Sequence, residues 1–301
     1  MSLNTPEAAM EWLRDTATAF MRGAKNDIHL PGKTEPAFGM PLLACAAGDD
    51  PLWAHYKRHV GQFHWTPLEA FALAYPQEKV PDEELRIVVW ILPQTDATLA
   101  DHRKETAWPA ERWARSRIFG EAHVNQALRS HLTEAMHDRG IQAVSPMLLP
   151  EWSAMPSDDF VFASTWSERH AAYAAGLGTF GLCDGLITPV GKAMRVGSLI
   201  ARIDLPVTPR PYIHHQEYCL YHSRGTCGVC MIRCPAGAIT AEGHNKRLCQ
   251  DYLDATVPYV LEQFGFDGYG CGLCQVNVPC ERRIPRRVGT GRAGTQARQT
   301  P

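Results

Sequence analysis

The chain has 301 residues, of which 45% are hydrophobic and 21% are charged. That balance is enough to bury a sizeable core, and it excludes a disorder-dominated or fibrous protein. The formal net charge is only −2, so no overall basic field favours a nucleic acid as the partner.

The first 23 residues lack the features of a targeting segment. They contain no basic stretch followed by an apolar run and no twin arginine, which an export signal would need. The longest apolar stretches, such as 87–92, are far shorter than the roughly 20 residues that span a bilayer. We therefore expect a cytoplasmic protein that does not contact a membrane.

The first predicted elements are a helix and a buried strand. Residues 5–22 favour a helix, because Thr5 can cap it and apolar residues recur at helical spacing until Gly23. The stretch 26–84 is irregular and predicts no element. The apolar, β-branched run 85–92 is typical of a central strand buried on both faces of a sheet.

A long helix and a short strand are expected next. Pro109 opens a helical pattern that Gly140 is placed to end, and residues 141–144 then favour a strand. The apolar positions of this helix recur every four residues, at Val124, Leu128, Leu132 and Met136.

A glycine-rich segment follows a third predicted helix. Residues 165–168 form a possible capping box for a helix that ends at Gly176. The segment 176–181, GLGTFG, has three glycines, which allow either a tight turn or the close approach of a flat ligand. Two strand-like runs, 185–188 and 194–203, come after it.

These patterns predict an α+β protein in three parts. Residues 1–210 form an α/β body, 211–285 a cysteine-rich module, and 286–301 a glycine- and arginine-rich tail that is expected to be disordered. Ten cysteines in a small secreted domain would suggest disulfides. Here most of them cluster late in a larger chain without an export signal, which points to metal binding.

The cysteine module carries the most specific motif in the chain. It reads C-x2-C-x3-C-P with one cysteine before it, a single cysteine after it, and then C-x2-C-x5-C. Each C-x2-C turn presents two sulfurs in the same direction. Bacterial two-cluster ferredoxins use such a string, and their cysteine before the proline ligates the other cluster. The motif therefore predicts two interlocking [4Fe–4S] sites.

Two ligand sets follow from that arrangement. The first predicted set consists of Cys219, Cys227, Cys230 and Cys280. The second predicted set consists of Cys234, Cys249, Cys271 and Cys274. Pro235 blocks helix continuation after Cys234, and the apolar residues up to Ile239 are expected to cover a cluster.

Zinc is the alternative metal, because the two C-x2-C pairs could make one tetrahedral four-thiolate site. The remaining cysteines, Cys45 and Cys183, are expected to be buried without a metal. Cys183 also lies beside the glycine-rich segment, which makes it a candidate for a thiol that faces a ligand. None of the thirteen histidines is predicted to bind a metal.

The cysteine string together with the upstream run SERHAAYAAGLGTFG at 167–181 resembles the epoxyqueuosine reductases and their relatives, the reductive dehalogenases. The resemblance covers about residues 110–285, and includes the pair Glu168-Arg169, the motif CQDYL from Cys249 and the motif CGLCQ from Cys271. It implies a nitroreductase-like α/β body that holds a base-off cobalamin, followed by a ferredoxin-like module with two [4Fe–4S] clusters.

The resemblance also implies roles for residues and partners. The clusters would deliver single electrons to cobalt, and an external ferredoxin, flavodoxin or reductase would supply those electrons. The glycine-rich segment would line the corrinoid, and the residues concerned are Gly176, Leu177, Gly178 and Gly181.

The chain departs from the family pattern at its expected proton donor. The family has an aspartate six residues before the Glu-Arg pair, where this chain has Phe162. Asp158 and Asp159 are the nearest acids and are candidates for the general acid. The family's Gly-Lys-Asn is Gly-Leu-Cys here, at 181–183, and the spacings beside the outermost module cysteines are longer.

The predicted function is an iron–sulfur oxidoreductase that passes electrons through two clusters to a cobalamin-type cofactor, which reduces a small molecule. The family's helical extension that helps to hold tRNA has no counterpart after the clusters, and the arginines of 282–287 are typical of a solvated tail. A tRNA substrate is therefore not expected. The alternatives are a ferredoxin-like electron-transfer protein without a corrinoid, a flavin in the body, and a tRNA epoxyqueuosine reductase.

Overall fold

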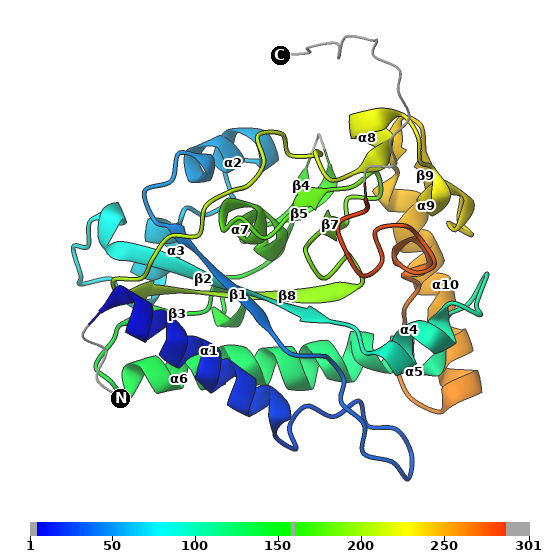
Figure 1. Cartoon of the computed structure of the whole chain (residues 1–301), viewed down its shortest axis with the longest axis horizontal. Coiled ribbons are helices and arrows are strands. Elements are labelled where there is room, and N and C mark those ends of the chain that lie inside the picture. Colours follow the sequence, from blue (N-terminus) through cyan, green and yellow to red (C-terminus); the bar gives the residue numbers. More distant parts are fainter. Residues whose placement is uncertain (1–4, 158–159, 287–301) are drawn as a thin grey trace.

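The computed structural model describes residues 5–157 and 160–286. Its main sheet has four strands in the order β1–β2–β8–β3, and each neighbouring pair is antiparallel. Helices cover both faces of this sheet (Figure 1). The strands are β1 (Leu42–Ala47), β2 (Leu85–Pro93), β3 (Ala143–Val144) and β8 (Met194–Arg202). The prediction of a mixed helical and sheet protein is confirmed.

β2 lies inside the sheet, as the apolar run 85–92 predicted. Its side chains alternate between two cores: Ile87 and Val89 pack into one, whereas Val88 and Trp90 pack into the other. All four are fully buried. Successive side chains of a strand point to opposite faces, so a strand covered on both faces needs an unbroken apolar sequence.

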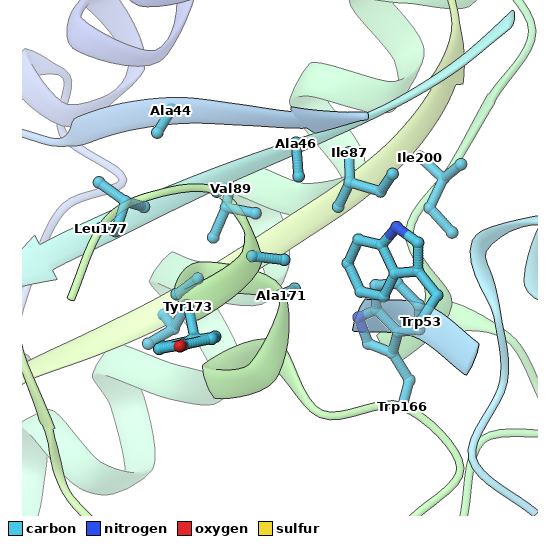
Figure 2. Close-up of a cluster of buried hydrophobic side chains, with 14 of the residues drawn as sticks. Ala44, Ala46, Trp53, Ile87, Val89, Trp166, Ala171, Tyr173, Leu177 and Ile200 are labelled. Atoms are coloured by element: carbon cyan, nitrogen blue, oxygen red, sulfur yellow. The ribbon is translucent and has the colours of Figure 1, made fainter. Parts of the chain in front are cut away.

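The first core lies between the sheet and the helices α2 (Leu52–Val60), α3 (Pro67–Ala74) and α7 (Glu168–Ala174). Figure 2 shows side chains of α7, among them Ala171 and Tyr173, gathered against side chains of β1 and β2. At its other end, Trp53 of α2 stacks on Trp166, with ring centroids 5.6 Å apart. The core thus fixes α7, and with it the start of the glycine-rich segment.

The second core lies under the opposite face, between the sheet and the helices α1 (Pro6–Arg22) and α6 (Gln126–His137). α1 begins and ends as predicted: Thr5 Oγ1 accepts a hydrogen bond from the Ala8 N–H at 3.2 Å, and Gly23 follows its last residue. Such a cap satisfies a backbone donor that the first helical turn leaves free.

The long helix predicted from Pro109 is present, but it is not uniform. It begins as α5 (Glu111–Arg115), continues as a π-helix over Ser116–Asn125, and becomes α6. At the end of the π-helix, the Asn125 side chain accepts a hydrogen bond from Trp90 Nε1 and donates one to the Val196 carbonyl, both at 2.9 Å. These bonds attach the helix to two neighbouring strands.

The capping box predicted at 165–168 is wrong. α7 starts at Glu168 after Ser167, without a side-chain cap, because the Thr165 hydroxyl instead accepts a hydrogen bond from the Ser153 N–H at 3.1 Å. The predicted end of this helix is correct, since Gly176 follows with a φ of +78°. That left-handed backbone conformation favours glycine.

The remaining elements are short, apart from one long helix. Those of the first two thirds are α4 (Asp96–His102), β4 (Ala154–Ser157), β5 (Val161–Ser164), β6 (Thr179–Phe180), β7 (Leu186–Ile187) and 3-10 turns at Asp82–Glu84 and Pro146–Leu148. Those of the last third are α8 (Leu220–Arg224), α9 (Val229–Ile232), β9 (Ile239–Thr240), β10 (Gly243–His244), α10 (Lys246–Phe264) and a 3-10 turn at Leu273–Gln275.

The cysteine-rich elements lie at one end of the main sheet. Figure 1 shows α8, α9, β9 and α10, coloured yellow to orange, beside the end where β2 finishes and β8 begins. No helix within the described residues is long and apolar enough to cross a membrane. Of the predicted tail, 286–301, all residues from 287 onward lie outside the described residues.

Candidate iron–sulfur site

The first predicted set of cysteines lines one cavity. Cys219 precedes α8, and Cys227 and Cys230 lie on either side of the first residue of α9. Cys280 lies near the end of the described residues. All four line the same cavity, together with Gly181 and Lys192. Four thiols that far apart in sequence thus converge on one space.

The second predicted set is gathered beside the first. Cys234 follows α9, and Cys249 lies in the first turn of α10. Cys271 precedes the 3-10 turn Leu273–Gln275, and Cys274 lies within it. Burial and the nearby charges of Cys249 and Cys234 together raise the pKa of Cys271 to about 11. These thiols must lose protons to bind metal, so loading of this site is coupled to proton release.

The hook between Cys271 and Cys274 is shaped by a glycine. Gly272 has a φ of +65°, and a Cβ there would lie 2.0 Å from the Trp113 ring. Only glycine allows both that backbone conformation and that approach. The hook therefore rests directly on the indole of α5, which fixes the direction of its two sulfurs.

The donor set has the number of thiols that two iron–sulfur clusters would need. A tetrahedral zinc site brings its sulfurs within about 3.8 Å of one another, because each Zn–S bond is ~2.3 Å. A cubane separates its thiolates more widely, and the eight cysteines, all free thiols, supply the two sets of four that two cubanes need.

Apolar side chains pack against part of the cysteines, and one of them, Ile239, belongs to the segment after Pro235 that was expected to cover a cluster. Ile239 and Val278 form one buried cluster with Cys219 and Cys230. Such packing excludes water from the space between the thiols. A drier surrounding strengthens the electrostatic effect of any nearby charge on a cluster.

Cys183 lies between the two sets. Its thiol is within hydrogen-bonding reach of Cys230, from the first set, and of Cys274, from the second. Lys192 Nζ donates a hydrogen bond to Cys183 Sγ at 3.2 Å. The hydrogen bonds from the two cysteines lower the pKa of Cys183 well below its ordinary value, and the charge of Lys192 lowers it further.

Lys192 is positioned by a close approach of two chain segments. Its N–H donates to the Cys280 carbonyl at 2.9 Å, and the Ala193 N–H donates to the Glu281 carbonyl at 3.2 Å. Gly191 makes this possible, because it has a φ of +87° and a Cβ there would lie 2.0 Å from the Glu281 oxygen. No local motif identified Lys192 from the sequence.

The residues predicted to line a corrinoid are mostly packed against their own chain. A Cβ on Gly178 would lie 2.2 Å from the Ile187 oxygen, and one on Gly176 would lie 2.6 Å from the Pro209 oxygen. Leu177 is buried in the first core. Gly181 alone of the four lines the cysteine cavity. The corrinoid-lining role stays a prediction.

The position at which the resemblance implied a proton donor is occupied by a half-exposed aromatic side chain. Phe162 lies on β5, and its carbonyl accepts a hydrogen bond from Lys246 Nζ at 3.1 Å. That contact joins the start of α10, which carries Cys249, to the β4–β5 hairpin. The candidate acids Asp158 and Asp159 lie outside the described residues.

One histidine connects the second set to the loop after the glycine-rich segment. His244 Nδ1 lies 3.0 Å from an Asp184 carboxylate oxygen. Burial lowers the pKa of His244, but hydrogen bonds with Asp184 and Cys249 outweigh it and raise the pKa to about 9. His244 thus places a positive charge beside a predicted cluster ligand.

Comparisons with known proteins found similarity in sequence and in fold. No protein-family model matches the chain. The epoxyqueuosine reductase of Staphylococcus aureus is 32% identical over 124 residues, which are 39% of this chain and 30% of that protein. The epoxyqueuosine reductase of Vibrio cholerae is 32% identical over 133 residues, which are 42% of this chain and 34% of that protein. The chain therefore spans well under half the length of these curated relatives.

The fold is shared with a solved member of the same group. The structure of epoxyqueuosine reductase from Bacillus subtilis superposes with a TM-score of 0.50 at 17% sequence identity, and the match covers 95% of this chain and 68% of that chain. At that identity the match shows the fold alone. The chain is thus similar in sequence to two epoxyqueuosine reductases over about two fifths of its length, and similar in fold to a solved epoxyqueuosine reductase.

Proposed function

We propose that the chain is an iron–sulfur oxidoreductase that moves single electrons through two adjacent [4Fe–4S] clusters. The observation that carries this proposal is the convergence of eight thiols into two neighbouring sets, with Cys183 in contact with one member of each. When bound, the clusters would accept and release one electron at a time. The finer architecture that we propose is a nitroreductase-like body with a ferredoxin-like cluster module.

The protein's own residues would set how the clusters work. The first set would hold one cluster and the second set the other, while Ile239 and Val278 keep water out. Trp113 beneath Gly272 fixes one hook, and Lys192 stands between the sets. Electrons would enter from an external ferredoxin, flavodoxin or reductase in the cytoplasm, and the reduced substrate would be a small molecule.

The electron acceptor in the body is the open part of the proposal. A cobalamin-type cofactor is the candidate that the resemblance to epoxyqueuosine reductases supports. A flavin would keep the enzyme class, and a partner protein would make the chain an electron-transfer component. Anaerobically purified protein, reconstituted with iron, sulfide and cobalamin and then desalted, should hold two clusters and retain a base-off corrinoid spectrum.

Each outcome of that experiment decides one part of the proposal. Two clusters with retained cobalt support the corrinoid-dependent enzyme. Two clusters with bound flavin, or with neither cofactor, remove the corrinoid and favour the respective alternative. About one zinc without acid-labile sulfide, as a structural zinc site would give, would end the iron–sulfur assignment.

Reduction of epoxyqueuosine in tRNA is the second candidate, because both curated relatives carry that name. The test is to incubate the reduced, cluster-loaded protein with an epoxyqueuosine-modified tRNA stem loop and to follow the nucleoside by mass spectrometry. Loss of one oxygen atom would support this candidate. An unchanged nucleoside, in the presence of a relative that converts it, would exclude it.

A further inference from the structure

Lys192 is a buried cation without a carboxylate partner. The residue is only 3% exposed, and within the described parts of the chain no aspartate or glutamate forms an ion pair with it. The groups that act on its ammonium are thiols, namely Cys183, Cys280, Cys274 and Cys230. Three of these belong to the predicted cluster ligands, and they come from both sets.

A buried ammonium is costly, because it loses its hydration, and the hydrogen bond to Cys183 replaces only part of that hydration. The chain nevertheless fixes Lys192 in this position, through the backbone bond to Cys280 and through Gly191. Negative charge on both sides of the Lys192 ammonium would offset the cost of burying it. Thiolate-ligated clusters supply such charge, and the lysine stands where two of them would meet.

We propose that Lys192, held by Cys183, is a shared counter-charge that raises the reduction potentials of both clusters. The inference rests on the proposed function, since it requires both clusters. Lys192 is a positioning residue in this role: it ligates nothing and touches no substrate. Cys183 orients the ammonium by accepting its hydrogen bond at 3.2 Å, and it is a ninth thiol that does not bind iron.

The physical reason is the charge that a cluster gains on reduction. An electron placed on either cluster is attracted by a cation a short distance away, and the low dielectric of the buried site strengthens that attraction. Charges and hydrogen bonds near the sulfurs are known to set cluster potentials. Removing the ammonium should therefore make both clusters harder to reduce.

The test is a redox titration of the Lys192→Met variant, followed by electron paramagnetic resonance. We expect it to keep the iron and sulfide content of the wild type and to show lower midpoint potentials for both clusters. Lys192→Arg, which keeps the charge, should restore most of the shift. Lys57→Met is the control, because Lys57 lies on α2 and pairs with Glu69 at 2.9 Å. The midpoint potentials of both clusters should be unchanged in this variant.

The Cys183→Ala variant tests whether Cys183 orients the Lys192 ammonium or is itself an iron ligand. We expect this variant to keep both clusters and to shift the potentials less than Lys192→Met does. Loss of half the iron in Cys183→Ala would make Cys183 a ligand and overturn the assignment. Unchanged potentials in Lys192→Met would overturn it as well. If Lys192→Met does not load clusters, equal potentials in Lys192→Gln and Lys192→Arg would overturn it in the same way.

The two proposals fail in different ways. Wild-type protein without iron and labile sulfide would remove the proposed function and this inference together. Wild-type protein with two clusters, but with potentials that do not respond to the charge at Lys192, would remove the inference and leave the function in place.

Discussion

Arg129 and Glu168 form a bidentate ion pair inside the protein. Arg129 Nη2 lies 2.7 Å from Glu168 Oε2, and Arg129 Nε lies 3.0 Å from Oε1. The arginine also contacts Glu121 at 2.8 Å. Because Arg129 is on α6 and Glu168 begins α7, the pair joins a helix on one side of the sheet to the helix that leads into the glycine-rich segment.

Loss of one partner should destabilise the body strongly. In Arg129→Met, two carboxylates face each other at a site where Arg129 itself is only 2% exposed, and breaking a buried pair costs roughly 3–5 kcal/mol. Urea unfolding should show a loss of about 3 kcal/mol or more in the free energy of unfolding. The matched control is Glu84→Gln, because Glu84 forms an exposed pair with Arg202. It should cost less than about 1 kcal/mol, and an equal cost in both variants would contradict the prediction.

The ligand sets predict which cysteine belongs to which cluster. Cys230→Ser should lose the first cluster and Cys271→Ser the second, so each variant should show a clear loss of iron and labile sulfide in anaerobic preparations. Cluster binding contributes folding free energy, so the thermal stability of both variants should fall. Cys45→Ser is the control. Cys45 is buried on β1, away from the sets, and burial raises its pKa to about 12. Full iron in Cys230→Ser or Cys271→Ser would disprove the sets.

The close approach at Gly191 predicts a position where alanine is not tolerated. Gly191→Ala adds the strain of a positive φ and also a contact at 2.0 Å from the Glu281 oxygen. Strain of this kind costs roughly 1–2 kcal/mol, and displacement of Lys192 and Cys280 should lower iron content as well. Gly140→Ala separates the two effects, because Gly140 has a φ of +73° with nothing within 4 Å. It should lose stability but keep its iron; equal iron loss in both would contradict the argument.

His64 predicts a loss of stability in acid. It is fully buried, and desolvation lowers its pKa from 6.5 to about 4. Below about pH 6.5, His64 therefore becomes protonated in the unfolded chain but stays neutral in the folded chain. The free energy of unfolding is highest above that pH and falls as the pH drops toward 4. The full effect is roughly 3 kcal/mol, at 1.36 kcal/mol for each pKa unit.

The measurement for His64 is the free energy of unfolding from pH 7 to pH 4, compared with His64→Phe. Other groups and the clusters respond to acid in both proteins, so the difference between the two proteins reports on His64 alone. We expect the wild type to lose more stability than the variant across this range. Parallel curves would show that His64 does not titrate as its burial requires.

Much of the fold follows from local sequence signals. The apolar run 85–92 predicted a strand buried on both faces, and it forms β2. Thr5 and Gly23 lie at the two ends of α1, as predicted. The stretch 26–84 gave no signal, because β1 is short and rich in alanine. Its strand conformation depends on β2, which pairs with it along its whole length.

The predictions that failed, or that could not be made, depend on contacts between residues far apart in the sequence. The capping box at 165–168 failed because the Thr165 hydroxyl bonds Ser153 instead. In the candidate site, the spacing of the cysteines indicated the two sets, since C-x2-C hooks are local. Lys192 could not be found that way, because its partners range from Cys183 to Cys280 and meet only in the folded chain.

The pairing of residues 192–193 with 280–281 means that the cysteine-rich segment both leaves from the body and returns to it. Its covalent connection near the exposed stretch 209–211 is therefore not what holds the two regions together. After proteolytic cleavage in that stretch, the two fragments should still co-elute in gel filtration. They should dissociate only in denaturant.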